Sequence, residues 1–256
     1  MSTPNDLDPT GRFTSRADDY VRYRPTYPAA AIDALLAGLA PPERLVAVDV
    51  GAGTGISSRL LAERGVRVSA VEPNRAMREA AAPHPGVTWL DGSAEAIPLP
   101  EATADLTLAA QAFHWFRAEE SVREMARVTK SGGRLALLWN HRSRTDSFMR
   151  GYEEIILAVL ERGADPAVVG MASDVAAVER SGLFGPRRIV SFEHRQRVDR
   201  DGLIGRALSA SYVPKEGAGR ARLVELLEAL YARYAREDGV DFVYDAEVTL
   251  AERLPR

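Results

Sequence analysis

The chain has 256 residues, of which 46% are hydrophobic, so it can form a sizeable core and is not a disordered chain. Its formal net charge of −3 gives no reason to expect nucleic acid or an anionic membrane as a partner, and the absence of cysteine excludes disulfides, thiolate metal sites and cysteine nucleophiles. No apolar run reaches the ~18 residues of a membrane-spanning helix, and the polar N-terminus lacks a signal-peptide core, so we expect a cytoplasmic protein.

The region 45–140 alternates short β-branched runs with helical patterns. The apolar runs predict strands at 44–50, 66–72, 86–92, 104–112 and 133–140. Amphipathic spacing predicts helices at 54–64, 74–82 and 117–129, the second ended by prolines and the third by the sequence KSGG. Nearly continuous apolar strands that alternate with helices indicate a parallel sheet covered on both faces.

The pattern changes after residue 140. Apolar residues at helical spacing predict amphipathic helices around 152–160 and 223–234, and we expect both apolar stripes to face a core. The runs at 187–198 and 240–254 predict two further strands. Helices inserted after the fifth strand would lie over the carboxyl edge of the sheet, where open α/β folds bind their ligands.

A glycine-rich loop joins the first predicted strand to the first predicted helix. Gly51, Gly53 and Gly55 follow the strand in the order GxGxG, and glycine permits the backbone angles and close approach that a ligand needs. A dinucleotide fingerprint would read GxGxxG, whereas this chain has Ile56 at the sixth position. The loop therefore favours a bound ligand over a simple tight turn, but it favours a dinucleotide only weakly.

Glu72 ends the second predicted strand, about twenty residues after the glycines. A carboxylate at this position can accept both hydroxyls of an adenosine ribose. Nicotinamide dinucleotides and S-adenosylmethionine (SAM) both contain that ribose, so Glu72 does not separate them. Its alternative role is a charge near the start of the next helix.

Two later segments do separate these cofactors. They are LDGSAEAIPLPEATADL at 90–106 and QAFHWF at 111–116, and together with the glycine loop they resemble class I SAM-dependent methyltransferases. Within that superfamily the chain is similar to the methyltransferase type 11 branch, and most of all to trans-aconitate methyltransferase-like members. The segment YVRYRPTYP at 20–28 is a third likeness to this branch.

The resemblance implies a Rossmann-like, doubly wound α/β fold. Its seven-stranded sheet would be mostly parallel, with an antiparallel last strand and a helical cap. We expect one domain over 1–256. Its expected parts are an N-terminal lid at 12–30, a cofactor-binding core at 45–140, helical cap and substrate elements with the sixth strand at 145–235, and the final strand at 239–253.

The resemblance also implies which residues bind SAM. It places Asp49 near the methionyl amine, Glu72 on the ribose, and Gln111 along the methionyl part. Many relatives carry Asp where this chain has Ser93, a neutral and therefore weaker acceptor for the adenine amino group. The complete expected set is Tyr20, Arg24, Asp49, Gly51, Ala52, Gly53, Glu72, Pro73, Ser93, Ala94, Glu95 and Gln111.

The expected acceptor site lies at the end of the fourth strand. There the resemblance places His114 and Trp115 beside the methyl group, with His114 as the candidate catalytic base or, alternatively, as a buried structural residue. Arg142 and Tyr23 are further candidates for substrate contacts. A carboxylate acceptor would need cationic residues for orientation, whereas a hydroxyl or amine would profit from a base.

The leading interpretation is a SAM-dependent methyltransferase that acts on a small-molecule acceptor, with a carboxylate as a candidate, and releases S-adenosyl-L-homocysteine. We expect no metal, and a monomer or homodimer. One alternative is a SAM-binding sensor or regulatory protein without turnover. The other is an NAD(P)-dependent oxidoreductase, against which the GxGxG spacing and the GSAE and QAFHWF segments argue.

Overall fold

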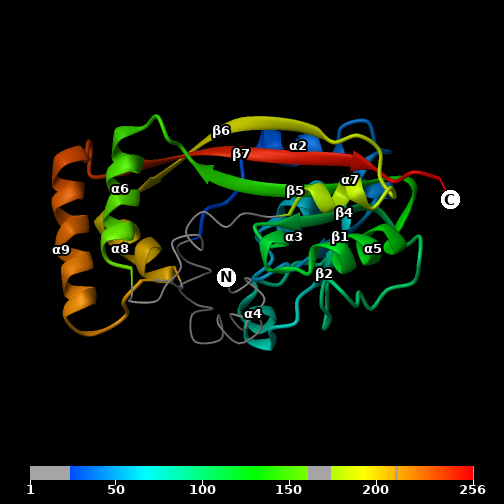
Figure 1. Cartoon of the computed structure of the whole chain (residues 1–256), viewed down its shortest axis with the longest axis horizontal. Coiled ribbons are helices and arrows are strands. Elements are labelled where there is room, and N and C mark those ends of the chain that lie inside the picture. Colours follow the sequence, from blue (N-terminus) through cyan, green and yellow to red (C-terminus); the bar gives the residue numbers. More distant parts are fainter. Residues whose placement is uncertain (1–23, 161–173, 211–212, 256) are drawn as a thin grey trace.

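The computed structural model describes residues 24–160, 174–210 and 213–255 (Figure 1). One seven-stranded sheet, in the order β3-β2-β1-β4-β5-β7-β6, organises the fold. Its strands are β1 (Val46–Val50), β2 (Arg67–Val71), β3 (Val87–Leu90), β4 (Ala104–Ala110), β5 (Thr129–Arg142), β6 (Arg188–Val198) and β7 (Val240–Glu252). The strands β1 to β5 pair in parallel, and β7 runs antiparallel to both β5 and β6. The predicted seven-stranded sheet with an antiparallel last strand is confirmed.

Helices cover both faces of this sheet, as the apolar strands predict. The α-helices are α2 (Ala29–Leu36), α3 (Ile56–Ala62), α4 (Arg75–Ala80), α5 (Ala118–Val128), α6 (Ser147–Ala158), α7 (Ala176–Arg180), α8 (Arg200–Ser209) and α9 (Gly217–Tyr234). Two short 3-10 turns are η3 (Pro42–Arg44) and η4 (Phe113–Trp115).

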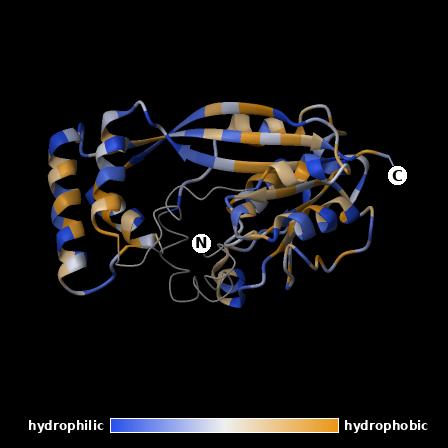
Figure 2. Ribbon diagram, viewed as in Figure 1, coloured by the Kyte–Doolittle hydropathy of each residue, from blue (hydrophilic) through white to orange (hydrophobic). Residues whose placement is uncertain are grey.

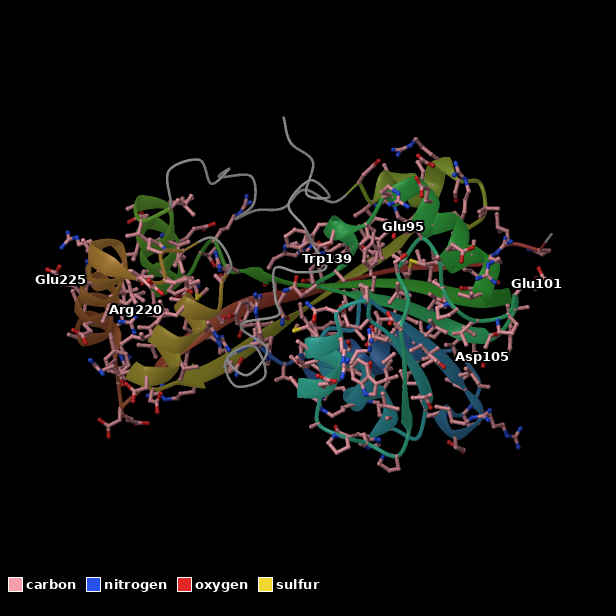
Figure 3. All side chains as sticks on the ribbon, turned by 90° about the horizontal axis from the view of Figure 1, so that it is seen from below. Glu95, Glu101, Asp105, Trp139, Arg220 and Glu225 are labelled. Carbon is pink, nitrogen blue, oxygen red and sulfur yellow. The ribbon has the colours of Figure 1, made fainter. Side chains whose placement is uncertain are left out.

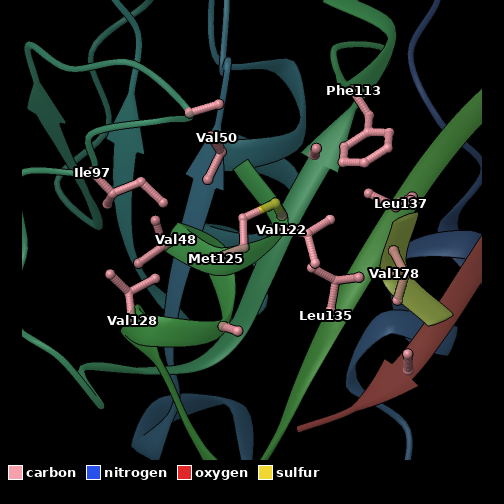
Figure 4. Close-up of a cluster of buried hydrophobic side chains, with 14 of the residues drawn as sticks. Val48, Val50, Ile97, Phe113, Val122, Met125, Val128, Leu135, Leu137 and Val178 are labelled. Carbon is pink, nitrogen blue, oxygen red and sulfur yellow. The ribbon is translucent and has the colours of Figure 1, made fainter. Parts of the chain in front are cut away.

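Side chains that alternate along the strands divide the core into two layers. On one face Val48 and Val50 of β1 pack with Val122 and Met125 of α5, and α7 joins the same cluster (Figure 4). On the other face Ala47 and other strand residues pack against α2 and α3. At the carboxyl ends of β1, β2 and β4 the sheet is followed by loops and not by the helices of either layer.

A third cluster lies beyond the carboxyl end of β5, where α6, α8 and α9 pack on the start of β7 (Figure 1). Tyr152 and Phe242 lie at its centre, with their ring centroids 5.0 Å apart. Helix α9 carries both apolar and polar residues along its length (Figure 2). Arg220 and Glu225 mark α9 at the opposite end of the molecule from Glu101 and Asp105 (Figure 3). The predicted amphipathic helices therefore do face a core.

The sequence KSGG does not form a turn outside the sheet. The helix α5 ends at Val128, one residue before the predicted end, and β5 begins at once. It contains a bulge, because Ala104 pairs with Thr129 and Leu106 with Arg134. A Cβ on Gly133 would lie 2.9 Å from the Lys130 carbonyl oxygen, so the bulge needs a glycine there. In the described part of the chain, no helix combines the length and apolarity that a membrane crossing requires.

Candidate active site

A cavity of about 310 Å³ lies at the carboxyl ends of β1, β2 and β4. The loops that follow these three strands and β3, together with the first turns of α3 and α4, supply most of its wall, and the segment before α2 supplies the rest. This is the edge at which open α/β sheets bind ligands, as predicted. The predicted residues that line the cavity are Arg24, Gly51, Ala52, Gly53, Glu72, Pro73, Ser93, Ala94, Glu95, Gln111 and Trp115.

The glycine loop between β1 and α3 is shaped by three left-handed residues. Gly51, Gly53 and Gly55 have φ angles of +67°, +58° and +75°. A Cβ on Gly51 would lie 2.8 Å from the Cβ of Ala112 and 3.0 Å from the Phe116 ring. Conformation and space therefore both require glycine at position 51.

Glu72 joins the ends of β1 and β2 through its carboxylate. Its Oε2 accepts a hydrogen bond of 2.9 Å from the Gly53 amide, and its Oε1 accepts one of 2.9 Å from the Asn74 amide. Burial raises the pKa of this carboxyl, the charge of Asp49 adds to the rise, and the two amides and Arg78 oppose it. The helix cap itself is Asn74, whose Oδ1 accepts from the Ala76 amide. Glu72 thus lines the cavity as an oriented carboxylate.

Asp49 lies behind the glycine loop and does not line the cavity. The side chain is fully buried, and its Oδ2 accepts hydrogen bonds of 2.6 Å from the hydroxyls of Ser57 and Ser58. Burial raises the pKa of Asp49 to about 6, although these hydroxyls oppose the rise. Its Oδ1 has no partner among the described residues. The predicted contact with a methionyl amine stays a prediction.

The GSAE segment forms a compact turn at the cavity wall. The Ala96 amide donates to the Ser93 carbonyl. Glu95, which is labelled in Figure 3, accepts a 2.9 Å hydrogen bond from the Arg117 amide at the start of α5. These bonds hold Ser93 and Ala94 against the cavity. Ser93 and Ala94 both line the cavity, and their predicted contacts with adenine stay a prediction.

Gln111 lines the cavity in a strained backbone conformation. Its φ is +53°, and its amide donates to the Leu138 carbonyl at 2.8 Å. A non-glycine residue in the left-handed region is uncommon and often marks a functional site. The side-chain amide lies 3.4 Å from the Asn140 carbonyl oxygen, which directs it across the end of the sheet.

His114 and Trp115 lie in the turn η4, but only Trp115 lines the cavity. The His114 ring packs on the Trp115 ring with centroids 5.3 Å apart. Burial lowers the pKa of His114 to about 4, and the positive charge of Arg24 adds to this effect. The ring is neutral at pH 7. The predicted position of His114 beside a methyl group stays a prediction.

The remaining predicted residues lie apart from the cavity or outside the described chain. Arg142 does not line it, and its guanidinium lies 5.3 Å from the Tyr152 ring centroid of α6. Tyr20 and Tyr23 lie outside the described residues. Sequence reasoning also missed lining residues, among them Thr54 and Met77. Thr54 lies inside the glycine motif and could have been found there, whereas Met77 resembles an ordinary core residue of a helix.

Comparisons with known proteins agree with this geometry. Residues 48–137 match the family model described as a methyltransferase domain. An uncharacterized methyltransferase of Mycobacterium tuberculosis is 42% identical over 145 residues, which are 56% of this chain and 58% of that protein. The aligned part is thus less than two thirds of the relative's own length.

Solved structures extend the likeness beyond the matched region. A putative type II methyltransferase from Anaeromyxobacter dehalogenans aligns with 91% of this chain and 100% of its own, at 27% identity and a TM-score of 0.62. A second structure is a geranyl diphosphate C-methyltransferase from Streptomyces coelicolor, solved with S-adenosyl-L-homocysteine. The alignment covers 88% of this chain and 77% of that chain, with 14% identity and a TM-score of 0.50, so the likeness shows the fold alone. The likeness to the trans-aconitate branch stays a prediction. Residues 48–137 therefore match a methyltransferase domain, and the chain shares its fold with solved methyltransferases.

Proposed function

We propose that this protein is a SAM-dependent methyltransferase that methylates a small-molecule acceptor. The observation that carries the proposal is the pairing of a left-handed glycine loop with the buried Glu72 carboxylate at one cavity. The Gly53 amide donates to Glu72, so the loop and the ribose-binding acid form one unit. A cofactor that contains adenosine and an amino acid fits this arrangement.

The cavity residues suit each part of SAM. Glu72 would accept from the ribose hydroxyls, and the Ser93–Ala94 turn would contact the adenine. Thr54 lines the cavity with a buried hydroxyl that has no partner among the described residues. A buried polar atom without a partner is unfavourable, so a ligand group at Thr54 would remove that penalty. Gln111 would contact the methionyl part of SAM.

The sulfonium of SAM supplies an activated methyl group, so the protein mainly aligns the acceptor and excludes water. Alignment alone can supply about 7–11 kcal/mol of the barrier reduction. Trp115 and Phe116 give the cavity an aromatic wall near the end of β4, where an acceptor would approach. Catalysis then depends on the shape of this wall more than on proton transfer.

The acceptor that we favour is already nucleophilic near neutral pH, such as a carboxylate. Burial and Arg24 lower the pKa of His114 to about 4, which makes its neutral ring a weak base. Arg24 lines the cavity and would orient an anionic acceptor. A carboxylate needs orientation and no base, so it suits these residues better than an alcohol or an amine.

A nicotinamide dinucleotide suits the site less well. Its pyrophosphate would require the open N-terminus of the following helix. Here the indole of Trp89 packs against Gly55, the cap of α3, so closely that an added Cβ would lie 2.8 Å from it. The second alternative, a SAM sensor without turnover, has the same cofactor contacts and differs only in lacking methyl transfer.

Calorimetric titration tests the cofactor first. We expect saturable binding of S-adenosyl-L-homocysteine, no binding of NADH, and weakened binding in Glu72→Ala. Binding of NADH alone would refute the proposal. Methyl-labelled SAM with a panel of small acids, phenols and amines then tests turnover. Transfer to acids supports the favoured acceptor class, transfer only to amines or phenols contradicts it, and no transfer to any compound favours the sensor. Cytoplasmic location and a monomeric or homodimeric state belong to the same proposal.

A further inference from the structure

A row of three side chains crosses the far end of the sheet, outside the cavity. Arg142, the last residue of β5, lies directly opposite Tyr244 of β7, and Tyr244 lies directly opposite His194 of β6. Residues directly opposite each other on antiparallel strands project from the same face of the sheet, so these side chains are neighbours. The His194 ring stacks on the Tyr244 ring, with their centroids 6.1 Å apart. None of the three is among the described residues that line the cavity.

Helix α8, which packs at this end of the sheet, adds a second arginine to the row (Figure 1). Arg206 is 7% exposed, and its guanidinium donates hydrogen bonds of 2.7 Å to the Tyr244 hydroxyl and of 2.7 Å to Oε1 of Gln196. Its Cζ also lies 4.6 Å from the ring centroid of Phe242, within the range of a cation–π contact. These three contacts are with neutral groups, which orient the guanidinium without cancelling its charge.

The segment before α2 connects this row to the cavity. The Thr26 carbonyl oxygen accepts a hydrogen bond of 2.9 Å from the Asn140 side chain of β5, and His194 also forms a hydrogen bond with the Thr26 backbone. Two residues earlier, Arg24 lines the cavity. The same short segment is therefore attached to the strands that carry the row and presents a positive charge to the cavity.

Three arginines act on the Tyr244 hydroxyl. Burial raises its pKa, and the charges of Arg206, Arg142 and Arg24 oppose that rise. Burial and the charge of Arg206 also lower the pKa of His194, although its hydrogen bond to the backbone opposes this effect. Positive charge from three separate elements thus meets at the first half of β7. Guanidinium groups bind carboxylate and phosphate oxygens through paired N–H donors, so an anion is the ligand that this arrangement favours.

The row lies away from the end of β4, where an acceptor would approach the methyl group. Ala110 ends β4 and pairs with Leu138 of β5, and Arg142 comes four residues later on β5. A strand rises about 3.3 Å per residue, so Arg142 lies roughly 13 Å beyond the end of β4. A group held at the row is therefore a different part of the acceptor from the atom that is methylated.

We propose that Arg142, Arg206 and Tyr244 form a subsite for a carboxylate or phosphate group of the acceptor, remote from the atom that receives the methyl group. This inference rests on the proposed function and extends it, because it gives the acceptor a second recognised group and assigns specificity to residues outside the cavity. The Tyr244 hydroxyl accepts from Arg206 and still has its own proton to donate to the anion. An acceptor anchored in this way would present its other end to the methyl group in a fixed orientation.

Nuclear magnetic resonance of the histidine rings tests the subsite by direct binding. The probes are hexanoate and hexyl phosphate, whose alkyl stem suits the aromatic rings beside the two guanidinium groups, and neutral hexanol. Each is added to protein saturated with S-adenosyl-L-homocysteine. A bound anion offsets the charge of Arg206, so the pKa of His194 should rise with hexanoate, with hexyl phosphate or with both, and stay unchanged with hexanol. The anion that acts at the lower concentration identifies the group as a carboxylate or a phosphate. His84, before β3 at the opposite edge of the sheet, is the internal control and should not respond.

Arg142→Gln and Tyr244→Phe test the same subsite by substitution. Each removes one group that would bind the anion, so the Kd of the bound probe should rise about 10- to 150-fold, as expected for a lost hydrogen bond to a charged group. The affinity for S-adenosyl-L-homocysteine should stay at the wild-type value, which distinguishes a lost subsite from a folding defect. Arg195→Gln is the matched control, because Arg195 is exposed, follows His194 on β6 and pairs with Glu193.

The inference is overturned if neither anion raises the pKa of His194, or if both variants bind the probes as tightly as the wild type does. Failure of S-adenosyl-L-homocysteine to bind overturns the proposed function itself, which separates the two failures.

Discussion

Gly51→Ala tests the claim that the glycine loop is both conformationally and sterically restricted. A left-handed backbone costs a residue with a Cβ about 1–2 kcal/mol. The new methyl group would also lie 2.8 Å from the Ala112 Cβ and 3.0 Å from the Phe116 ring, and overpacking of this kind costs roughly 1–3 kcal/mol. We therefore expect the free energy of unfolding to fall by about 2–5 kcal/mol, and the cavity to lose its fit for S-adenosyl-L-homocysteine.

Gly132→Ala is the matched control for this prediction. Gly132 has a φ of +73°, close to that of Gly51, but an added Cβ would meet no atom within 4 Å. Only the conformational cost of about 1–2 kcal/mol remains, and ligand binding should be unchanged. Urea unfolding and calorimetric titration of both variants give the comparison. Equal destabilisation by the two substitutions, with ligand affinity retained in Gly51→Ala, would refute the steric argument.

Three further predictions concern single side chains of the site. Glu72→Gln removes the charge of a carboxylate that accepts from two amides. A hydrogen bond to a charged group contributes ~1.5–3 kcal/mol, so its loss should raise the Kd for S-adenosyl-L-homocysteine about 10- to 150-fold. A change below twofold in calorimetry would contradict this prediction. His114 has a pKa of about 4, below its ordinary 6.5, so its neutral form contributes stability that is lost as the pH falls from 6.5 toward 4, up to about 3 kcal/mol. Urea unfolding of wild type and His114→Gln across that window should show the difference, and parallel pH profiles would contradict it. Asn74→Ala removes the cap of α4 and should lower the free energy of unfolding by roughly 0.5–2 kcal/mol, whereas an unchanged urea midpoint would show that the cap contributes nothing.

The centre of the sheet was predictable from the sequence because β1 and β4 are buried on both faces. Val46–Val50 and Ala104–Ala110 form nearly continuous apolar runs, and the chain between them carries clear helical spacing. Helix α8 was not predicted, since its sequence RDGLIGRALS contains two glycines that weaken helical propensity. Tertiary packing of Leu203 and Ala207 into the third cluster stabilises it instead. A single sequence does not reveal that contact.

The candidate site was also predictable only in part. Its backbone conformation was predictable, because a left-handed loop at Gly51 and Gly53 requires glycines that are visible in the sequence. Side-chain orientation was not. The motif around His114 gave its place in the chain, but the direction of its ring depends on the turn η4 and on packing against Trp115. Arg142 was expected just past the fifth strand, but it is the last residue of β5, and its guanidinium packs near Tyr152.

Three unfavourable features of this fold lie at or beside the cavity, where a ligand could offset them. Asp49 is a buried carboxyl with a pKa near 6, Gln111 is a non-glycine residue at a φ of +53°, and Thr54 has a buried hydroxyl without a described partner. Because the folded pKa of Asp49 exceeds its ordinary 3.8, this group destabilises the free protein increasingly as the pH rises from 3.8 through 6, by up to about 3 kcal/mol. A ligand that binds only the folded state adds stability in proportion to its affinity, about 2.7 kcal/mol at one hundred times its Kd. Saturating SAM should therefore stabilise the protein more at pH 7 than at pH 5, and Asp49→Asn should remove that difference. Equal stabilisation of the wild type at both pH values, measured by urea unfolding with and without SAM, would mean that the buried acid is a structural group with no link to the cofactor.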